Sequence, residues 1–192
     1  MLDMYNEVLK KNLTEKRYNH SVNVSKKAIY LAKKYGADVK KAEIAGLLHD
    51  ITKQTEETEQ LQLISDAEMK LSALEFDNKK LWHALSGAAY LKTKLNIDDE
   101  EILNAVKFHT TGRSEMSLLE KIVLVADMIS DDRTSAESVK VKKIAEESLD
   151  KAVCLTARFS IELLMEKEMT IAPNTLAAYN DTVKNFLKIK KV

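Results

Sequence analysis

The chain has 192 residues, of which 45% are hydrophobic and 31% charged, a composition typical of a globular protein of one domain. Its 30 basic and 30 acidic residues cancel, so there is no excess of positive charge to neutralise a nucleic-acid backbone, and we expect no nucleic-acid partner. A single cysteine, Cys154, excludes an internal disulfide and a thiolate metal site, and no apolar run approaches the roughly 20 residues of a membrane span. The sequence therefore predicts a cytoplasmic protein with no membrane partner.

Four glycines and one proline predict an all-α fold, because β-rich folds need more turn residues. Apolar residues at helical spacing predict helices in chain order. These are 14–35, a helix after Asp38 that reaches His49, one near 56–65, a short one near 67–74, 79–95, one after 98–101 that reaches His109, one after Ser117 that reaches Asp127, and three near 136–147, 150–167 and 175–188.

Capping residues support several of these boundaries. Gly36 is expected to end the first helix in the left-handed conformation, and Asp38 to cap the next. Ser117 and Glu120 form a capping-box sequence, Asn78 is expected to cap 79–95, and Asn174 to cap the last helix. The lysine-rich end, 184–192, is expected to be a frayed helix tail.

The histidines carry the strongest chemical signal. All four lie within or at the end of apolar helical segments, together with two aspartates, in the order His20, His49, Asp50, His83, His109 and Asp127. A single buried histidine is more commonly bonded to a carbonyl than to a metal. Several buried imidazoles and carboxylates together are costly unless they are paired or bound to a metal ion. The series therefore points to a metal site in the core of a helical bundle.

The order H…HD…H…H…D resembles that of the HD-domain metal-dependent phosphohydrolases. The surrounding strings look like the YqeK family of bacterial HD proteins, and the resemblance runs from about Arg17 to Asn180. The strings that carry it are RYNHSVNVSKKAIYLAKKYGAD, AEIAGLLHDITK, HTTGRSEMSLLEKIVLVADMIS and TIAPNTLAAYN. The dipeptide HD is weak evidence alone, whereas HTTGR followed by Met116-Ser117 and Ala126-Asp127 is far more specific.

The resemblance implies a single HD domain over 1–192, an all-α bundle with a buried metal site. Its core would span about 14–130, and C-terminal helices at 136–188 would complete a nucleotide pocket. The implied activity is the symmetrical hydrolysis of diadenosine tetraphosphate to two ADP, so the partner would be a dinucleoside polyphosphate or an ADP-like nucleotide.

The resemblance also implies the site residues. An iron ion would be held by His20, His49, Asp50 and Asp127, although two histidines and two carboxylates would also accept manganese or zinc. The implied catalytic residues are Asp50, Lys53, His83 and His109. The implied nucleotide contacts are Arg17, His20, Asp50, Lys53, His83, His109, Thr110, Asp127, Arg133, Thr170, Ile171, Ala172, Pro173, Asn174 and Thr175.

His83 and His109 have two interpretations. They contact phosphate oxygens beside one metal ion, or they ligate a second ion that Asp50 bridges. We favour phosphate contact, because no further carboxylate falls near them at ligand-like positions. Gly87 lies one turn after His83. We interpret it as a site of close helix packing in preference to a site that leaves room for a ligand.

The chain departs from the family pattern at two places. Ser130-Asp131-Asp132 replaces the family's usual Glu-Pro, and Leu85 stands where a proline is common, which leaves the reach of Arg133 open. Two other functions remain as alternatives. One is an HD phosphohydrolase for nucleoside mono- or triphosphates or cyclic dinucleotides, and the other is a non-catalytic nucleotide-binding module. The sequence is compatible with a homodimer and does not fix the oligomeric state.

Overall fold

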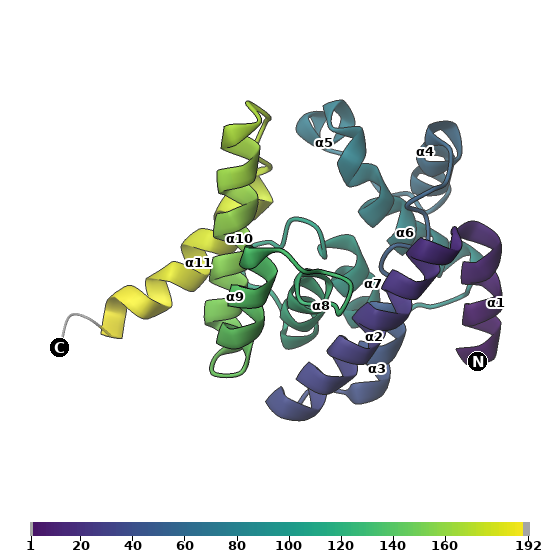
Figure 1. Cartoon of the computed structure of the whole chain (residues 1–192). Coiled ribbons are helices and arrows are strands. Elements are labelled where there is room, and N and C mark those ends of the chain that lie inside the picture. The colour runs from purple at the N-terminus through teal and green to yellow at the C-terminus, as the bar shows by residue number, and fades with distance from the viewer. Residues whose placement is uncertain (1, 190–192) are drawn as a thin grey trace.

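The computed structural model describes residues 2–189, and within them every regular element is a helix (Figure 1). In chain order the elements are α1 (Leu2–Asn12), α2 (Glu15–Tyr35), α3 (Val39–Leu48), α4 (Glu57–Asp66), α5 (Ala73–Asp77), a 3-10 turn (Lys79–Leu81), α6 (Trp82–Lys94), α7 (Glu100–Lys107), α8 (Leu118–Met128), α9 (Ala136–Ala145), α10 (Leu149–Glu166) and α11 (Pro173–Ile189). The predicted all-α class is confirmed. None of the helices in the described range combines the length and apolarity needed to cross a bilayer.

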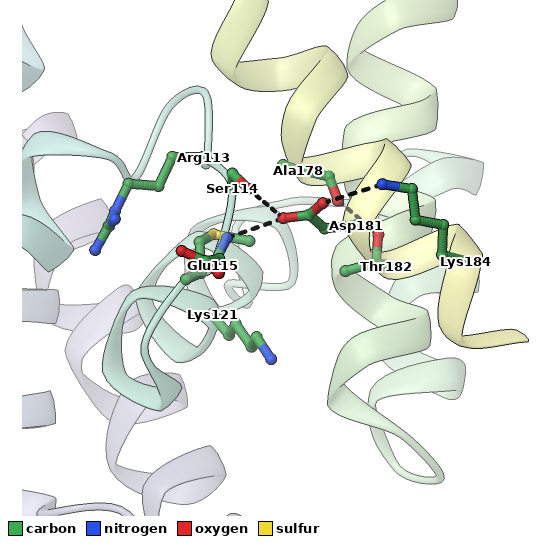
Figure 2. Close-up of a pocket in the computed structure, with 9 residues that line it drawn as sticks. Arg113, Ser114, Glu115, Lys121, Ala178, Asp181, Thr182 and Lys184 are labelled. Atoms are coloured by element: carbon green, nitrogen blue, oxygen red, sulfur yellow. Dashed lines mark hydrogen bonds and ion pairs between the residues drawn. The ribbon is translucent and has the colours of Figure 1, made fainter.

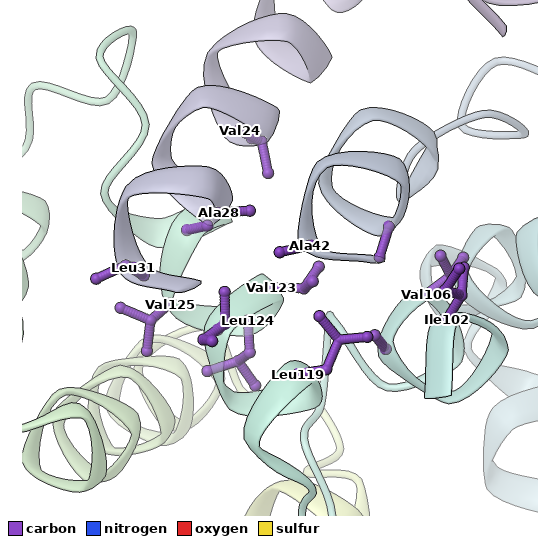
Figure 3. Close-up of a cluster of buried hydrophobic side chains, with 14 of the residues drawn as sticks. Val24, Ala28, Leu31, Ala42, Ile102, Val106, Leu119, Val123, Leu124 and Val125 are labelled. Atoms are coloured by element: carbon purple, nitrogen blue, oxygen red, sulfur yellow. The ribbon is translucent and has the colours of Figure 1, made fainter. Parts of the chain in front are cut away.

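Four helices surround the main core, with α2 packed on α3 and α8, and α7 packed on α3 and α8. Figure 3 shows their apolar faces meeting. The core side chains labelled there come from α2 (Val24, Ala28, Leu31), α3 (Ala42), α7 (Ile102, Val106) and α8 (Leu119, Val123, Leu124, Val125). On the other side of α8, α10 packs against it, and α9 and α11 pack on α10. Helices α1 and α11, the first and last of the described residues, lie on opposite sides of the molecule (Figure 1).

Helices α2 and α3 approach each other closely at Gly46 in α3. A Cβ atom there would lie 3.0 Å from both the Cβ of Ala28 and the Cα of Ser25. Because α2 comes so near, only glycine fits at this position without a shift of backbone. The same short distance brings the C-terminal end of α3, and the residues that follow it, against α2.

Most capping predictions are confirmed. Gly36 has φ +78° and donates its N–H to the carbonyl of Ala32, and the Asp38 side chain accepts from the N–H groups of Lys40 and Lys41. Ser117 and Glu120 form both hydrogen bonds of a capping box.

Other boundaries differ from the prediction. The predicted helix near 67–74 is wrong, because Glu68 has φ +56° and Ser72 forms a capping box with Glu75, so the short helix α5 starts only at Ala73. Asn78 makes no side-chain cap, and a 3-10 turn precedes α6.

At the two ends of the chain the prediction also needs correction. Pro173 is the first residue of α11, a position that proline favours, so Asn174 lies inside the helix rather than capping it. Helix α1 was not predicted, although its buried Tyr5 and Leu9 stand at helical spacing. Of the predicted frayed tail, residues 190–192 lie outside the described residues.

Candidate metal centre and adjoining cleft

The six residues of the histidine–aspartate series meet in one place. They come from α2 (His20), the turn after α3 (His49, Asp50), α6 (His83), the turn after α7 (His109) and α8 (Asp127). All four histidines and Asp50 are buried. The turn that carries His49 and Asp50 is tied to α6, because the Thr52 hydroxyl donates to the carbonyl of His83 at 2.9 Å.

Three of the histidine rings are oriented in the same way. Nδ1 of His49, His83 and His109 lies 2.7–2.8 Å from the backbone carbonyl three residues earlier in the chain. A carbonyl only accepts hydrogen bonds, so Nδ1 carries the proton and Nε2 presents a lone pair. Each of these rings therefore offers Nε2 to the interior of the cluster.

Ligand atoms in the cluster form three overlapping groups, within each of which the atoms lie less than 4.8 Å apart. They are His20, His49 and Asp50; His49, His109 and Asp127; and Asp50, His83 and His109. Asp50 joins the first group to the third, with Oδ1 at 3.3 Å from Nε2 of His83 and 3.5 Å from that of His109. Gly87 beside them has a packing role, as expected, since a Cβ there would lie 3.3 Å from a Val106 methyl carbon.

Three of these atoms, all from the first group, are buried without a hydrogen-bond partner: Nε2 of His20, Nε2 of His49 and Oδ1 of Asp50. A buried polar atom without a partner costs free energy comparable to a lost hydrogen bond. A divalent cation would satisfy all three, and imidazole nitrogen with carboxylate oxygen is a donor set that such ions accept. The residues present therefore fit a metal ion.

The protonation states suit the same role. Burial lowers the pKa of His49 to about 4, so its imidazole is neutral at pH 7. Burial alone would raise the pKa of Asp50, but the neighbouring His49, His109 and His83 together hold it well below its usual range. The pair therefore offers a neutral nitrogen and an ionised oxygen, the forms in which these groups bind metals.

Three predicted cations also reach the cluster. Arg17 Nη1 lies 3.0 Å from Asp50 Oδ2, and Lys53 Nζ lies 3.0 Å from His83 Nε2. Arg133 places Nη2 2.7 Å from Oδ1 of Asp127 and donates from Nε to the backbone carbonyl of that residue. The reach of Arg133, which the sequence left open, thus extends to the site.

A cleft of about 820 Å³ adjoins the cluster, and His109 and Asp127 belong to both. Thr110 and Arg133 also line it, as do residues of α10 that were not predicted, among them Phe159 and Leu163. The Thr110 hydroxyl lies 3.2 Å from His109 Nε2 and donates to it. The sequence carried no signal for these residues, because the exposure of Leu163, 48%, is known only from the fold.

The predicted nucleotide-contacting stretch 170–175 lies at the start of α11, outside the residues that line this cleft. Ala172 and Thr175 are buried there, and the Thr175 N–H donates to the Ala172 carbonyl. The structure thus shows a turn that begins α11 and does not bring the stretch to the cleft wall.

A second cleft, of about 350 Å³, lies between α11 and the loop before α8 (Figure 2). Its carboxylate, Asp181, accepts hydrogen bonds from the Ser114 hydroxyl and from the Glu115 N–H. Arg113 points away from Asp181 in Figure 2 and pairs with the buried Glu120 at 2.8 Å. This cleft is thus a seam that joins α11 to the bundle.

Sequence reasoning missed one residue at the metal cluster, Asp132. Its Oδ2 lies 2.8 Å from Nδ1 of His20, and among the four histidines this is the one Nδ1 that is not directed at a backbone carbonyl. The departure from the family pattern at 130–132 marks this loop, but it does not tell which of the two carboxylates reaches His20.

Comparisons with known proteins agree with this architecture. The family model described as "HD domain" matches residues 17–132. The chain is 40% identical to the symmetrical bis(5'-nucleosyl)-tetraphosphatase of Bacillus subtilis, covering 90% of this chain and 92% of that protein. It is 42% identical to the protein of the same name from Halalkalibacterium halodurans, covering 91% and 92%.

A solved structure is equally close. The crystal structure of a "predicted HD superfamily hydrolase involved in NAD metabolism" from Clostridium acetobutylicum superposes with a TM-score of 0.92 at 37% identity. The match covers 96% of this chain and 98% of that one. The chain therefore belongs to the HD-domain family and, within it, to the group that contains the symmetrical bis(5'-nucleosyl)-tetraphosphatases of these bacteria.

Proposed function

We propose that this protein is a metal-dependent hydrolase that cleaves diadenosine tetraphosphate symmetrically into two ADP. The observation that carries the proposal is the set of buried ligand atoms without hydrogen-bond partners, on His20, His49 and Asp50, beside a cleft. The relatives from Bacillus subtilis and Halalkalibacterium halodurans supply the substrate class, since both are named for the symmetrical reaction.

His20, His49, Asp50 and Asp127 would hold the ion, and we propose iron, with manganese or zinc as alternatives that the same donors accept. When bound, the ion supplies Lewis-acid activation of water and of a phosphoryl oxygen. Water attacks the second phosphorus, the bond from that phosphorus to the oxygen bridging the second and third phosphates breaks, and each half leaves as ADP. Asp50 is our candidate for orienting that water.

The cations around the cluster would stabilise the negative charge of the tetraphosphate. Lys53 is a compact donor beside His83, and Arg17 and Arg133 offer planar forks suited to phosphate oxygens. The polyphosphate would enter from the cleft along α10, where Phe159 and Leu163 provide an apolar wall for a base. In this proposal the C-terminal helices complete the nucleotide pocket of a single domain. Residues 170–175 do not line the cleft, so they would contact only a part of the nucleotide that extends out of it.

His83 and His109 would contact the phosphates, which requires a proton on Nε2. Burial and the neighbouring His109 and Lys53 hold the pKa of His83 well below its ordinary value, and the charge of a bound phosphate would favour protonation. The alternative is a second ion, which Asp50 would bridge to the first. The Nε2 lone pairs of His83 and His109 favour this alternative, because a lone pair can bind a metal ion directly. Ion stoichiometry decides between them: two ions per chain, one of them lost in His83→Ala, would assign both rings to a second ion.

The proposal is tested by incubating the metal-loaded protein with diadenosine tetraphosphate and identifying the products. ADP alone is expected, whereas ATP with AMP would contradict symmetrical cleavage. Asp50→Ala is expected to lose bound metal and turnover together, and Asp131→Asn, on the nearby surface, to keep both. A fully active Asp50→Ala protein would overturn the mechanism.

Two other functions are separated by the same assays. A different HD phosphohydrolase would turn over a nucleoside mono- or triphosphate or a cyclic dinucleotide faster than the dinucleoside tetraphosphate. A non-catalytic module would bind ADP and hydrolyse nothing in the presence of Fe²⁺, Mn²⁺ or Zn²⁺. The cytoplasmic location and a homodimeric state stay predictions, to be checked by fractionation and by light scattering.

A further inference from the structure

His20 is oriented differently from the other three histidines. Those three donate Nδ1–H to a backbone carbonyl of their own segment. In His20, Nδ1 instead lies 2.8 Å from Oδ2 of Asp132, a residue 112 positions later in the chain. The orientation of this one ring therefore depends on a tertiary contact with a side chain.

The contact fixes which nitrogen of His20 faces the cluster. An ionised carboxylate only accepts hydrogen bonds, so Nδ1 carries a proton, and Nε2 is the nitrogen left to offer a lone pair to an ion. Nε2 is buried without a hydrogen-bond partner, although Asp127 Oδ1 lies 3.0 Å away. The ring of His20 is thus held between two carboxylates, with Nε2 on the side of the candidate ligands.

Asp132 is itself held in place. The Asn23 side chain, also on α2, donates to Oδ1 at 3.3 Å. The preceding residue, Asp131, pairs with Lys27 at 2.7 Å and with Lys142 at 3.4 Å. The loop after α8 is therefore fastened to α2 by two adjacent carboxylates, and only one of them touches a histidine.

We propose that Asp132 is a positioning residue for the metal centre: it sets the tautomer and angle of the His20 ring, makes Nε2 more basic, and so strengthens metal binding. Carboxylates that accept the second N–H of a ligating histidine act in this way in other metal sites. The inference rests on the proposed function to the extent that His20 binds the ion. Asp132 lies in the segment where this chain departs from the family pattern, so the effect would belong to this chain.

The test is the dissociation constant for Zn²⁺, used as a probe ion and measured on the whole chain by competition with a chromophoric chelator. Asp132→Ala is expected to weaken Zn²⁺ binding by about 10- to 100-fold. Asp132→Asn is expected to recover part of the loss, because the amide oxygen still accepts the Nδ1 proton. The matched control, Asp131→Ala, removes the neighbouring carboxylate from the same loop and is expected to bind Zn²⁺ as the parent does.

Unchanged Zn²⁺ affinity in a folded Asp132→Ala protein would overturn the proposal, and so would an equal loss in Asp131→Ala, which would indicate only that the loop had been loosened. If Asp132→Ala does not fold, Asp132→Asn is compared with Asp131→Asn. Weaker binding in the first alone supports the proposal, and equal binding overturns it. A parent protein that binds no Zn²⁺, Mn²⁺ or Fe²⁺ would instead remove the metal centre of the proposed function.

Discussion

Lys53 shows how one side chain near the cluster can be assigned to substrate rather than to metal. Its Nζ lies 3.0 Å from His83 Nε2, and burial lowers the pKa of Lys53 from its ordinary value. An ammonium group in a poorly solvated position interacts strongly with an approaching phosphate. An ammonium is not a metal ligand, so its removal should affect turnover without affecting the ion.

We therefore expect Lys53→Met to lower kcat/KM for diadenosine tetraphosphate by about 100- to 1000-fold, the cost of removing one donor to developing charge. Metal content should equal that of the parent, and Lys53→Arg should keep part of the activity. Lys34→Met is the control, because Lys34 pairs with Glu146 on the surface, and it should be fully active. Loss of metal in Lys53→Met would show that the lysine supports the centre itself.

At the scale of single residues the sequence predicted the cluster well. Four histidines within or at the end of apolar helical segments can be recognised from the sequence alone, and the structure brings all of them together with Asp50 and Asp127. Asp132 could not be found in this way, because nothing in a sequence tells which loop carboxylate folds back onto a helix more than a hundred residues earlier.

Among the helices, α2 and α3 pack closely enough at Gly46 to test by mutation. Gly46→Ala would place a methyl group 3.0 Å from the backbone Cα of Ser25, which cannot rotate away. Gly87→Ala would meet only the side chain of Val106 at 3.3 Å and two ordinary contacts. Both changes gain up to about 1 kcal/mol of helix propensity.

Urea denaturation should therefore separate the two variants. Gly46→Ala is expected to lower the free energy of unfolding by about 1–3 kcal/mol, the usual cost of overpacking. Gly87→Ala should stay within about 1 kcal/mol of the parent, because propensity offsets a small side-chain adjustment. Equal stability of the parent and Gly46→Ala would show that α2 can move away from α3.

Helix α7 begins at a carboxylate whose charge can be tested by pH. Asp99 accepts from the N–H groups of Glu101 and Ile102 and pairs with Lys41 of α3 at 2.8 Å. The hydrogen bond from Lys41 lowers the pKa of Asp99 from 3.8, and the two backbone N–H groups lower it further. Burial acts in the opposite direction but is the smaller effect. The pKa of Asp99 is lower in the folded protein than in the unfolded chain. Its charge therefore stabilises the fold fully above pH 3.8, and this stabilisation is lost as the pH falls through the pKa of the folded protein.

Asp99→Asn keeps a capping side chain and removes only the charge. The parent should be more stable than this variant near pH 7, and the difference should shrink as pH falls below about 4. The measurement is the free energy of unfolding by urea for both proteins from pH 7 to pH 3. A difference that stays constant over this range would contradict the assignment.

Helix boundaries were predictable where a cap or a stop residue stands at the end, as at Gly36, Asp38 and Ser117. They failed where the backbone turns at an unmarked residue, as at Glu68, whose positive φ no glycine announces. The turn at 170–175 shows a related limit of prediction from sequence. It follows α10 directly in the chain, yet it does not line the cleft that α10 lines.

At the scale of the whole molecule, the metal centre joins segments that are far apart in the chain. Its candidate ligands come from three places: α2, α8, and the turn that follows α3. The histidines of α6 and of the turn after α7 lie beside them. An unfolded chain holds no such arrangement, so an ion that binds here binds mainly the folded protein. Metal binding and folding should therefore be coupled.

We expect Zn²⁺ at 100 times its dissociation constant to stabilise the protein by about 2.7 kcal/mol. For a chain of this length that corresponds to a rise in Tm of roughly 5–10 °C, and a chelator should reverse it. His49→Ala removes a fully buried ligand, so its Tm should not respond to Zn²⁺, whereas Asp131→Asn should respond like the parent. An equal rise in the Tm of His49→Ala would mean that Zn²⁺ stabilises the protein by binding at another site. The buried cluster would then have to be explained by hydrogen bonding alone.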